Sequence, residues 1–296
     1  MKPGVLRIAY LQLALSMALV GANVAVAKLL AEALPIPMIA FLRCVLAVLL
    51  LWPLARLLES AARLEGPVLQ NLAWQALFGT VIYNAGLLAG LRLTSALEGG
   101  LVLASLPAVV ALGSAFWLRE RLTRPQWIAV GLAAFGMAAM TMARSSGEAA
   151  GSVVGNALIF GGIIGEALYV LLARRIAGRI GVITASLWMQ IFSAVMLAPF
   201  ALPDMASITA LMDPRLAALL VFHSVTASVL CLLLWYAGLQ RVGAGVAGIF
   251  TAFLPATAAL VAVVILRESF TTIHAIGFAL MMLSVLIATW PKRQSA

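Results

Sequence analysis

The chain has 296 residues, of which 64% are hydrophobic and 10% are charged, and its mean hydropathy is +1.12. Soluble proteins are about 45–50% apolar and about 25% charged, because charged groups cover a surface that faces water. The composition therefore excludes an ordinary cytosolic enzyme and any disordered or fibrous chain. It predicts an all-α integral membrane protein that is solvated mainly by lipid.

The net charge of +9 does not indicate binding to nucleic acid. The Lys and Arg residues stand singly or in twos and threes between apolar runs, whereas tracking a phosphate backbone needs a continuous basic face. Cys44 and Cys231 both fall inside apolar runs, so they offer neither a disulfide framework nor a metal-binding spacing. We expect no cofactor, no metal and no nucleic-acid partner.

Ten apolar runs are long enough, at about 20 residues, to cross the hydrocarbon core as helices. They lie near residues 5–28, 36–57, 69–91, 94–118, 125–143, 153–173, 181–203, 215–240, 243–266 and 272–290. Lys2, Arg7 and the Ala25-Val26-Ala27 sequence resemble a signal peptide, but the first apolar run is longer than the usual 7–15 residues. We therefore treat it as the first span.

The distribution of Lys and Arg predicts that both termini are cytoplasmic. In that orientation thirteen of the nineteen basic residues fall in cytoplasmic segments, five fall outside, and Arg43 lies within the second span. Cytoplasmic loops carry the excess of Lys and Arg in membrane proteins. The +9 charge is thus an orientation signal.

The second half of the chain repeats the first at an offset of 148 residues. Residues 89–123 match residues 237–271 at 15 of 35 positions, among them Leu106-Pro107-Ala108 on Leu254-Pro255-Ala256 and Arg119-Glu120 on Arg267-Glu268. Five spans per repeat is an odd number, so the second copy enters the membrane from the opposite side. We expect two inverted five-helix repeats, over residues 1–148 and 149–296, as in many secondary transporters.

Two prolines occupy the middle of equivalent spans in the two repeats. Pro107 and Pro255 each remove a backbone hydrogen bond, which predicts a helix kink. The freed carbonyls need neighbouring groups or a cavity. The kinks either shape helix packing alone or bend both helices around a central cavity.

The pattern resembles the drug/metabolite transporter superfamily, in its EamA-type branch. Gly21-Ala22-Asn23 followed by Lys28 is similar to a motif of that family's first span, and the run from Pro37 to Arg43 is similar to its second. The proline-containing segments followed by Arg-Glu and Thr match its most recognisable motif in both halves. The resemblance covers essentially the whole chain.

The resemblance implies a basket-like bundle that exports small metabolites from a cavity formed by spans 1, 3, 4, 6, 8 and 9. Bacterial exporters of amino acids, aromatic ones included, are similar in length and organisation. Glu98 and Glu166 depart from the small residues expected at their positions.

Glu166 is the strongest candidate for a functional charge. It lies about 20 Å along its span, and an acid at that depth usually faces a cavity or a partner. It is either a proton-binding or charge-binding group of the transport site, or a protonated acid that hydrogen-bonds a neighbouring helix. Glu98, near the outer end of span 4, is a second possible charge site, although water or Arg92 would solvate it there.

Arg43 is the third possible charge site, in the outer half of span 2. It would bind a substrate carboxylate with both ends of its guanidinium, or it would serve as a scaffold ion pair or helix anchor.

Polar and aromatic side chains at suitable depth are candidates for lining the cavity, although each could instead serve helix packing. They are Asn23, Tyr83, Asn84, Ser105, Glu166, Tyr169, Ser224, Ser228, Trp235, Tyr236 and Thr251.

Several apparent motifs carry no chemistry in this context. Gly243, Gly245 and Gly248 spell G-x-G-x-x-G without a preceding strand. His223 and His274 belong to no zinc or catalytic pattern, so we expect no enzyme. The spacings Gly86/Gly90 and Gly161/Gly165 predict close helix packing.

We therefore expect a secondary transporter of the bacterial inner membrane that exports small metabolites, amino acids first among them, by alternating access. It would use no ATP, and a monomer is compatible with the sequence. The main alternative is an exporter of drugs or other cationic or hydrophobic compounds. An integral membrane enzyme, or a structural or sensor subunit, is more remote.

Overall fold

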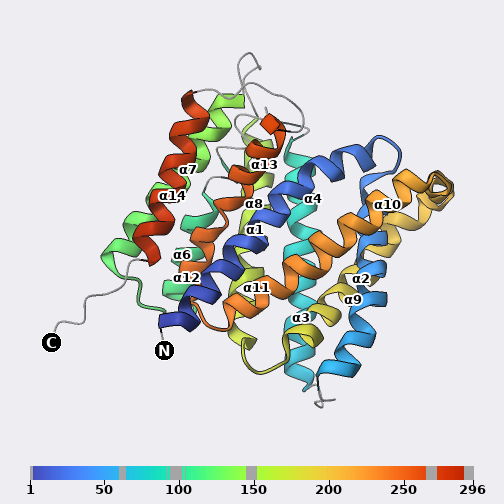
Figure 1. The fold of residues 1–296 in the computed structure, drawn as a ribbon, viewed down its shortest axis with the longest axis horizontal. Helices are drawn as coiled ribbons and strands as arrows, with labels where there is room; N and C mark the ends of the chain where they lie inside the picture. The colour runs from blue at the N-terminus through green and yellow to red at the C-terminus, as the bar shows by residue number, and fades with distance from the viewer. Residues whose placement is uncertain are drawn as a thin grey trace.

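The computed structural model describes residues 3–59, 65–91, 93, 102–103, 105–144, 152–264 and 272–289, and these residues form a bundle of helices (Figure 1). The α-helices are α1 (Pro3–Ala31), α2 (Ile36–Leu58), α3 (Gly66–Ala76), α4 (Tyr83–Leu91), α6 (Leu106–Phe116), α7 (Arg124–Arg144), α8 (Val153–Ile176), α9 (Val182–Ala201), α10 (Pro214–His223), α11 (Cys231–Leu239), α12 (Ala244–Phe250), α13 (Phe253–Val264) and α14 (Thr272–Thr289). Two π-helices, η1 (Leu77–Ile82) and η3 (Ser224–Leu230), and a 3₁₀-helix, η2 (Leu202–Met212), complete the set.

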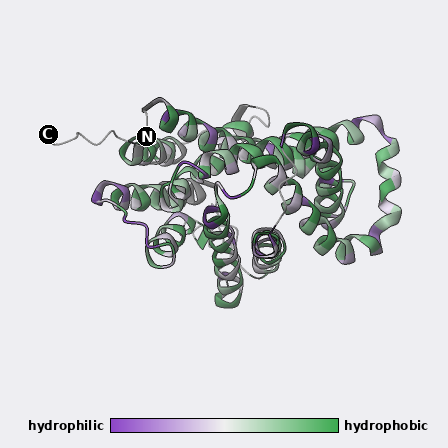
Figure 2. Cartoon of the chain, turned by 90° about the horizontal axis from the view of Figure 1, so that it is seen from below, coloured by the Kyte–Doolittle hydropathy of each residue, from purple (hydrophilic) through white to green (hydrophobic). Residues whose placement is uncertain are grey.

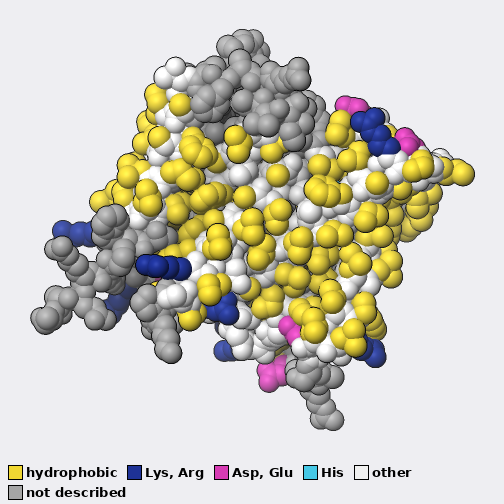
Figure 3. All heavy atoms as spheres, viewed as in Figure 1, with side chains coloured by type: hydrophobic (Ala, Val, Ile, Leu, Met, Phe, Trp, Pro, Cys, Tyr) yellow, Lys and Arg dark blue, Asp and Glu magenta, His cyan; other side chains and the backbone are white. Residues whose placement is uncertain are grey.

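Six helical stretches in the described part are long and apolar enough to cross a membrane. They are Gly4–Asn23, Ile36–Leu58, Gly66–Gly90, Val153–Ile176, Val182–Met212 and Pro214–Leu239. Hydrophobic residues run along nearly all helices (Figure 2), and they cover most of the face in Figure 3, with charged side chains toward its upper and lower ends. The all-helical membrane architecture expected from composition is therefore confirmed.

Helix starts follow the local sequence. Pro37, Pro67 and Pro214 lie in the first turns of α2, α3 and α10, where a missing N–H breaks no helical hydrogen bond. Ser152 caps α8 by accepting a hydrogen bond from the Gly155 N–H at 3.4 Å. Glu59, at the end of α2, caps α9 by accepting from the backbone N–H groups of Ile183 and Thr184 at 2.9 and 2.8 Å.

Equivalent elements of the two halves pack against each other, α2 on α9 and α7 on α14, while α4 packs on α8 and α11 packs on α1. The two π-helices η1 and η3 also occupy equivalent positions in the two repeats. The first residue of η3 lies 147 residues after that of η1, and the last residue lies 148 residues after that of η1. A π-helix adds a residue to a turn and often occurs at a functional site. The repeated π-helix indicates that the halves share local structure as well as sequence.

Pro107 and Pro255 lie at helix starts rather than within an unbroken helix. Pro107 is the second residue of α6, which begins directly after Ser105. Pro255 is the third residue of α13, which is separated from α12 by Thr251 and Ala252. The N–H groups of Thr251 and Ala252 donate to carbonyls three residues back, at 3.2 Å each. Around Pro255 the chain is therefore two short helices joined by a tight turn.

Glycines bring η1 and α4 into backbone contact with α8. A Cβ added to Gly86 would lie 2.7 Å from the Leu158 carbonyl oxygen, and one on Gly165 would lie 2.9 Å from the Phe78 carbonyl oxygen. The prediction of close packing is correct for Gly86, Gly90 and Gly165, but it is wrong for Gly161. One residue is 100° of helix rotation, so Gly161 points to the exposed side and Gly162 takes the contact.

We predict that Gly86→Ala lowers the thermal stability of the detergent-solubilised protein by about 1–3 kcal/mol, because the new methyl group overlaps backbone atoms that cannot rotate away. Gly161→Ala is the matched control, since a Cβ there meets no atom within 4 Å. The control should be neutral or stabilising by up to about 1 kcal/mol, the helix propensity difference. Equal melting temperatures for the two variants would contradict the packing described.

Candidate functional site

Glu166 lies on the interior face of α8. Its helical neighbours at i−4, i−3, i+3 and i+4 are Gly162, Ile163, Tyr169 and Val170, and all four are buried. Glu166 itself keeps a partly accessible side chain. Glu166 therefore faces the neighbouring helices rather than lipid.

Two tyrosines accompany this carboxylate. Glu166 lies within electrostatic range of Tyr83 on α4 and of Tyr169 one turn along α8. The ring of Tyr169 packs against η1, where a Cβ on Gly79 would lie 2.7 Å from the ring's Cγ. Tyr83 is half-buried and Tyr169 is buried. The structure thus brings together the three residues that form an aromatic and acidic group in the middle of the bundle.

A further ionisable group near Glu166 belongs to α11, which α1 contacts. The Cys231 thiol is within electrostatic range of Glu166. Ser16 on α1 donates a hydrogen bond to the Cys231 carbonyl oxygen at 2.8 Å, and its hydroxyl lies 3.2 Å from the Cys231 sulfur. Ionisable groups of α4, α8 and α11 thus lie within electrostatic range of Glu166, and α1 contacts α11 at Cys231.

A second polar group lies around Asn23, which joins α1 to α10 and η3. Asn23 Nδ2 donates to its own helix at the Leu19 carbonyl, which leaves Oδ1 as the acceptor for His223 Nδ1 at 2.9 Å and Thr226 Oγ1 at 3.0 Å. Asn23 and His223 are buried. Because Oδ1 only accepts, His223 carries its proton on Nδ1.

Arg43 adjoins this second group. It lies within electrostatic range of His223 and of Cys231. Its Nε is buried without a hydrogen-bond partner. Among the described residues, no carboxylate forms an ion pair with it; the one such pair lies elsewhere, between Arg174 and Glu120.

Tyr236 and Trp235 are buried in the middle of α11. Tyr236 Oη donates to Gln75 Oε1 at 2.5 Å, and Gln75 Nε2 donates to Asn71 Oδ1 at 2.6 Å, which makes a chain of three side chains between α11 and α3. Trp235 Nε1 is buried and has no acceptor within the described part of the chain. Tyr236 thus serves helix contact in this structure.

Five other predicted cavity residues use their polar atoms in helix contacts. Hydroxyls of Ser105, Ser224 and Thr251 donate to carbonyls of the preceding turn, as does the amide of Asn84, and the Ser228 carbonyl accepts from Gln190 Nε2 at 2.9 Å. Glu98 and the side chain of Pro255 lie outside what the structure describes. Of the predicted site residues that the structure describes, Glu166, Tyr83, Asn84, Ser105 and Arg43 are partly accessible, and Arg43 Nε and Trp235 Nε1 are buried without an acceptor.

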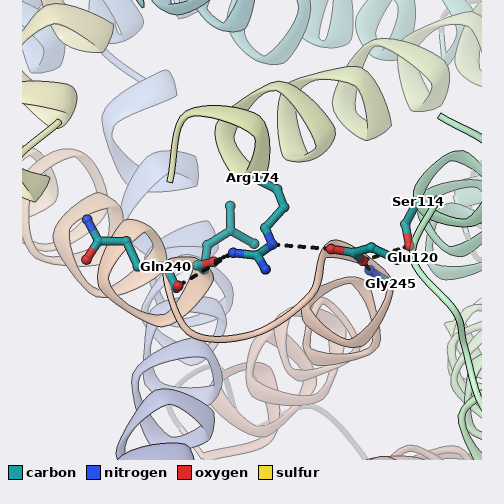
Figure 4. Close-up of polar contacts among 6 residues, drawn as sticks. Ser114, Glu120, Arg174, Gln240 and Gly245 are labelled. Atoms are coloured by element: carbon teal, nitrogen blue, oxygen red, sulfur yellow. Dashed lines mark hydrogen bonds and ion pairs between the residues drawn. The ribbon is translucent and has the colours of Figure 1, made fainter. Parts of the chain in front are cut away.

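A charged network closes one end of the bundle (Figure 4). Glu120 Oε1 accepts from Arg174 Nε at 3.2 Å, and Glu120 Oε2 accepts from Ser114 Oγ at 2.9 Å and from the Gly245 N–H at 3.4 Å. Arg174 Nη1 also donates to the Leu239 carbonyl at 3.1 Å. We call Glu120, Arg174 and these partners the latch. It joins the ends of α6, α8 and α11 to the start of α12.

The backbone before Glu120 is shaped for this contact. Arg119 has a φ of +54°, a left-handed conformation that non-glycine residues rarely adopt. It turns the chain after α6, so that the Glu120 N–H donates to the Ser114 carbonyl at 3.1 Å and the side chain points toward the second half. The latch lies at the end of the molecule where α1 begins and α14 ends (Figure 1).

Sequence reasoning missed most of these pairings. The Arg119-Glu120 motif was visible, but its partner Arg174 is 54 residues away and carried no signal of its own. His223 was set aside because it fits no zinc motif, and Gln75 and Ser16 were not singled out. A polar residue in an apolar span is the signal that would have found all three.

Comparisons with known proteins agree on the type of fold. The EamA-like transporter family matches the chain twice, at residues 7–142 and 153–290. An uncharacterized transporter of Bacillus subtilis, YetK, is 31% identical over 290 residues, covering 97% of this chain and 88% of the relative. An uncharacterized transporter of Archaeoglobus fulgidus is 26% identical over 212 residues, covering 71% and 74%. A solved crystal structure aligns with a TM-score of 0.79 at 20% identity, over 95% of this chain and 96% of that one.

We predict that the two charges of the latch depend on each other. Glu120→Gln and Arg174→Gln should each lower the melting temperature, and the double variant should lose less than the sum of the two. The side chains are 20% and 30% exposed, so solvent screening limits their coupling to about 0.5–1 kcal/mol.

Arg175→Gln is the control for this cycle, because Arg175 is the exposed neighbour of Arg174 on the same helix. It should leave the melting temperature within about 0.5 kcal/mol of the wild type. Strictly additive losses for Glu120 and Arg174 would show that the ion pair contributes nothing.

Proposed function

The chain belongs to the EamA-like transporter family, and on this premise we propose that it is a secondary transporter that exports amino acids across the bacterial inner membrane. One observation supports a solute that has an ammonium group, as amino acids do. Glu166 is an accessible acid on the interior face of α8, and none of the described Lys or Arg side chains forms an ion pair with it. A solute ammonium group would supply the missing positive charge.

The surroundings of Glu166 support an organic solute. Tyr83 and Tyr169 offer aromatic surface beside the carboxylate, and the remaining neighbours on α8 are apolar. Sites for small molecules are mostly apolar with a few polar groups that orient the ligand. A cation also gains energy from a nearby aromatic face. An ammonium group next to an apolar side chain fits this combination.

We propose alternating access as the mechanism. The chain would cross the membrane ten times, with both termini cytoplasmic and with repeats of five spans, over residues 1–148 and 149–296, inserted in opposite directions. The latch would then lie at the cytoplasmic end, where it would open to admit the solute and close before release outside. Transporters with such repeats alternate by movement of one part against the other around a central site.

Export of cationic or hydrophobic drugs is the second candidate. The same carboxylate favours it, because a single acid recognises any cation that fits the space. Amino acids and simple amines differ by a carboxylate, so a transport panel separates the two candidates. The proton is a third cation that Glu166 could bind, and an imposed pH gradient reveals whether transport depends on it.

The function is tested by counterflow in proteoliposomes without ATP. Purified protein is reconstituted with an unlabelled amino acid inside, and the uptake of the same labelled amino acid is followed. The panel spans amino acids, monoamines and cationic dyes. We expect counterflow of at least one amino acid. A folded, monodisperse protein that exchanges no amino acid in the panel would contradict the proposal.

We predict that Glu166→Gln lowers this counterflow roughly tenfold or more, because a charge-assisted hydrogen bond contributes about 1.5–3 kcal/mol. Glu65→Gln makes the same chemical change at an exposed residue before α3, and it should leave counterflow unchanged. If Glu166→Gln transports as well as Glu65→Gln does, Glu166 does not bind the solute.

A further inference from the structure

The loop between α6 and α7 and the first residue of α7 carry arginines that have no acidic partner in the described part of the chain. Arg119, Arg121 and Arg124 are exposed and lie within one short stretch of sequence. No described carboxylate forms an ion pair with any of them. Glu120 lies between the first two, but both of its oxygens are used in the latch. The loop therefore presents positive charge that the described carboxylates do not neutralise.

Side chains along this loop alternate between the protein and its surroundings. Glu120 accepts from the Gly245 N–H (Figure 4), and a Cβ on Gly245 would lie 2.7 Å from Leu122 Cδ2. Glu120 and Leu122 thus face the start of α12. Arg119 and Arg121 occupy the alternate positions and are exposed. Their Cα atoms are at most about 7 Å apart, the length of two extended residues. The two guanidinium groups therefore belong to one outward surface.

Exposed aromatic side chains flank the arginines. Trp117 follows α6 directly, and Trp127 lies in the first turn of α7. Both are exposed, as is Phe116 at the end of α6. Exposed tryptophans of membrane proteins gather where the hydrocarbon meets the lipid headgroups. Because the three arginines lie between these two tryptophans in sequence, we place them at the level of the lipid phosphates.

We propose that Arg119, Arg121 and Arg124 form a binding surface for the headgroup of an anionic phospholipid. A guanidinium matches a phosphate with two parallel N–H groups. Basic clusters beside membrane-spanning helices attract anionic lipids. The exposed tryptophans offer apolar surface to the acyl chains, which a free phosphate lacks. The inference concerns the lipid around the protein, so it holds whichever solute is transported.

The test titrates the purified protein in neutral detergent with phosphatidylglycerol and follows the melting temperature. A ligand that binds only the folded protein raises that temperature. We expect phosphatidylglycerol to raise it, whereas phosphatidylcholine and inorganic phosphate at the same concentrations do not. An equal rise with inorganic phosphate would assign the surface to free anions and overturn the inference. A wild type that does not respond to phosphatidylglycerol would overturn it as well.

The double variant Arg119→Gln/Arg121→Gln should need roughly tenfold or more phosphatidylglycerol for half of the maximal rise, since each arginine near an anionic surface contributes about fivefold in affinity. The matched control is Arg175→Gln/Arg179→Gln, which removes two exposed arginines at and just after the end of α8. It should keep the wild-type titration. Equal changes in the two variants would mean that general surface charge attracts the lipid, and an unchanged titration in the first would exclude the loop.

A second measurement tests the surface should the double variant fail to fold. Brominated lipids quench tryptophan fluorescence on contact, so brominated phosphatidylglycerol should quench the wild type more than brominated phosphatidylcholine does. Trp117→Phe should lose part of this excess. Trp74→Phe removes an exposed tryptophan of α3 and should keep it. An excess that both variants retain in full, or lose equally, would contradict binding at this loop.

Discussion

Hydrocarbon does not solvate charge, and this constraint governs where the charges of this protein can lie. A charged side chain within a span must face a partner or an internal space, or be neutralised. The Glu120–Arg174 pair satisfies the first condition at the end of the bundle. Glu166 lies partly accessible on a buried helix face, and none of the described Lys or Arg side chains forms an ion pair with it. This acid is the basis of our account of transport.

Close packing of backbones holds the acid in position. Gly86 and Gly162 let α4 lie directly on α8, so that Tyr83 and Glu166 come from adjacent turns of touching helices. The π-helices η1 and η3 precede α4 and α11, and each shifts the following side chains around the helix relative to an unbroken α-helix. Glycine contacts and π-helices thus orient the residues around Glu166. Neither feature contributes chemistry of its own.

The sequence was sufficient for the all-helical architecture and for the family. Long apolar runs can only be helices in lipid, because every backbone group must be satisfied within its own segment. Glu166 was identifiable for the same reason, as an acid deep in a span. Partners could not be identified, because His223 and Asn23 are 200 residues apart and Tyr236 and Gln75 are 161 apart. The wrong prediction for Gly161 has a simpler cause, since a four-residue spacing does not reveal which side of a helix faces its neighbour.

The central claim is that the transported solute binds to Glu166. An experimental structure of the protein in a lipid nanodisc with a transported amino acid tests it most directly. The account predicts solute density with the ammonium group within hydrogen-bond distance of the Glu166 carboxylate. Solute bound away from Glu166, or a Glu166 side chain that points into lipid, would contradict it.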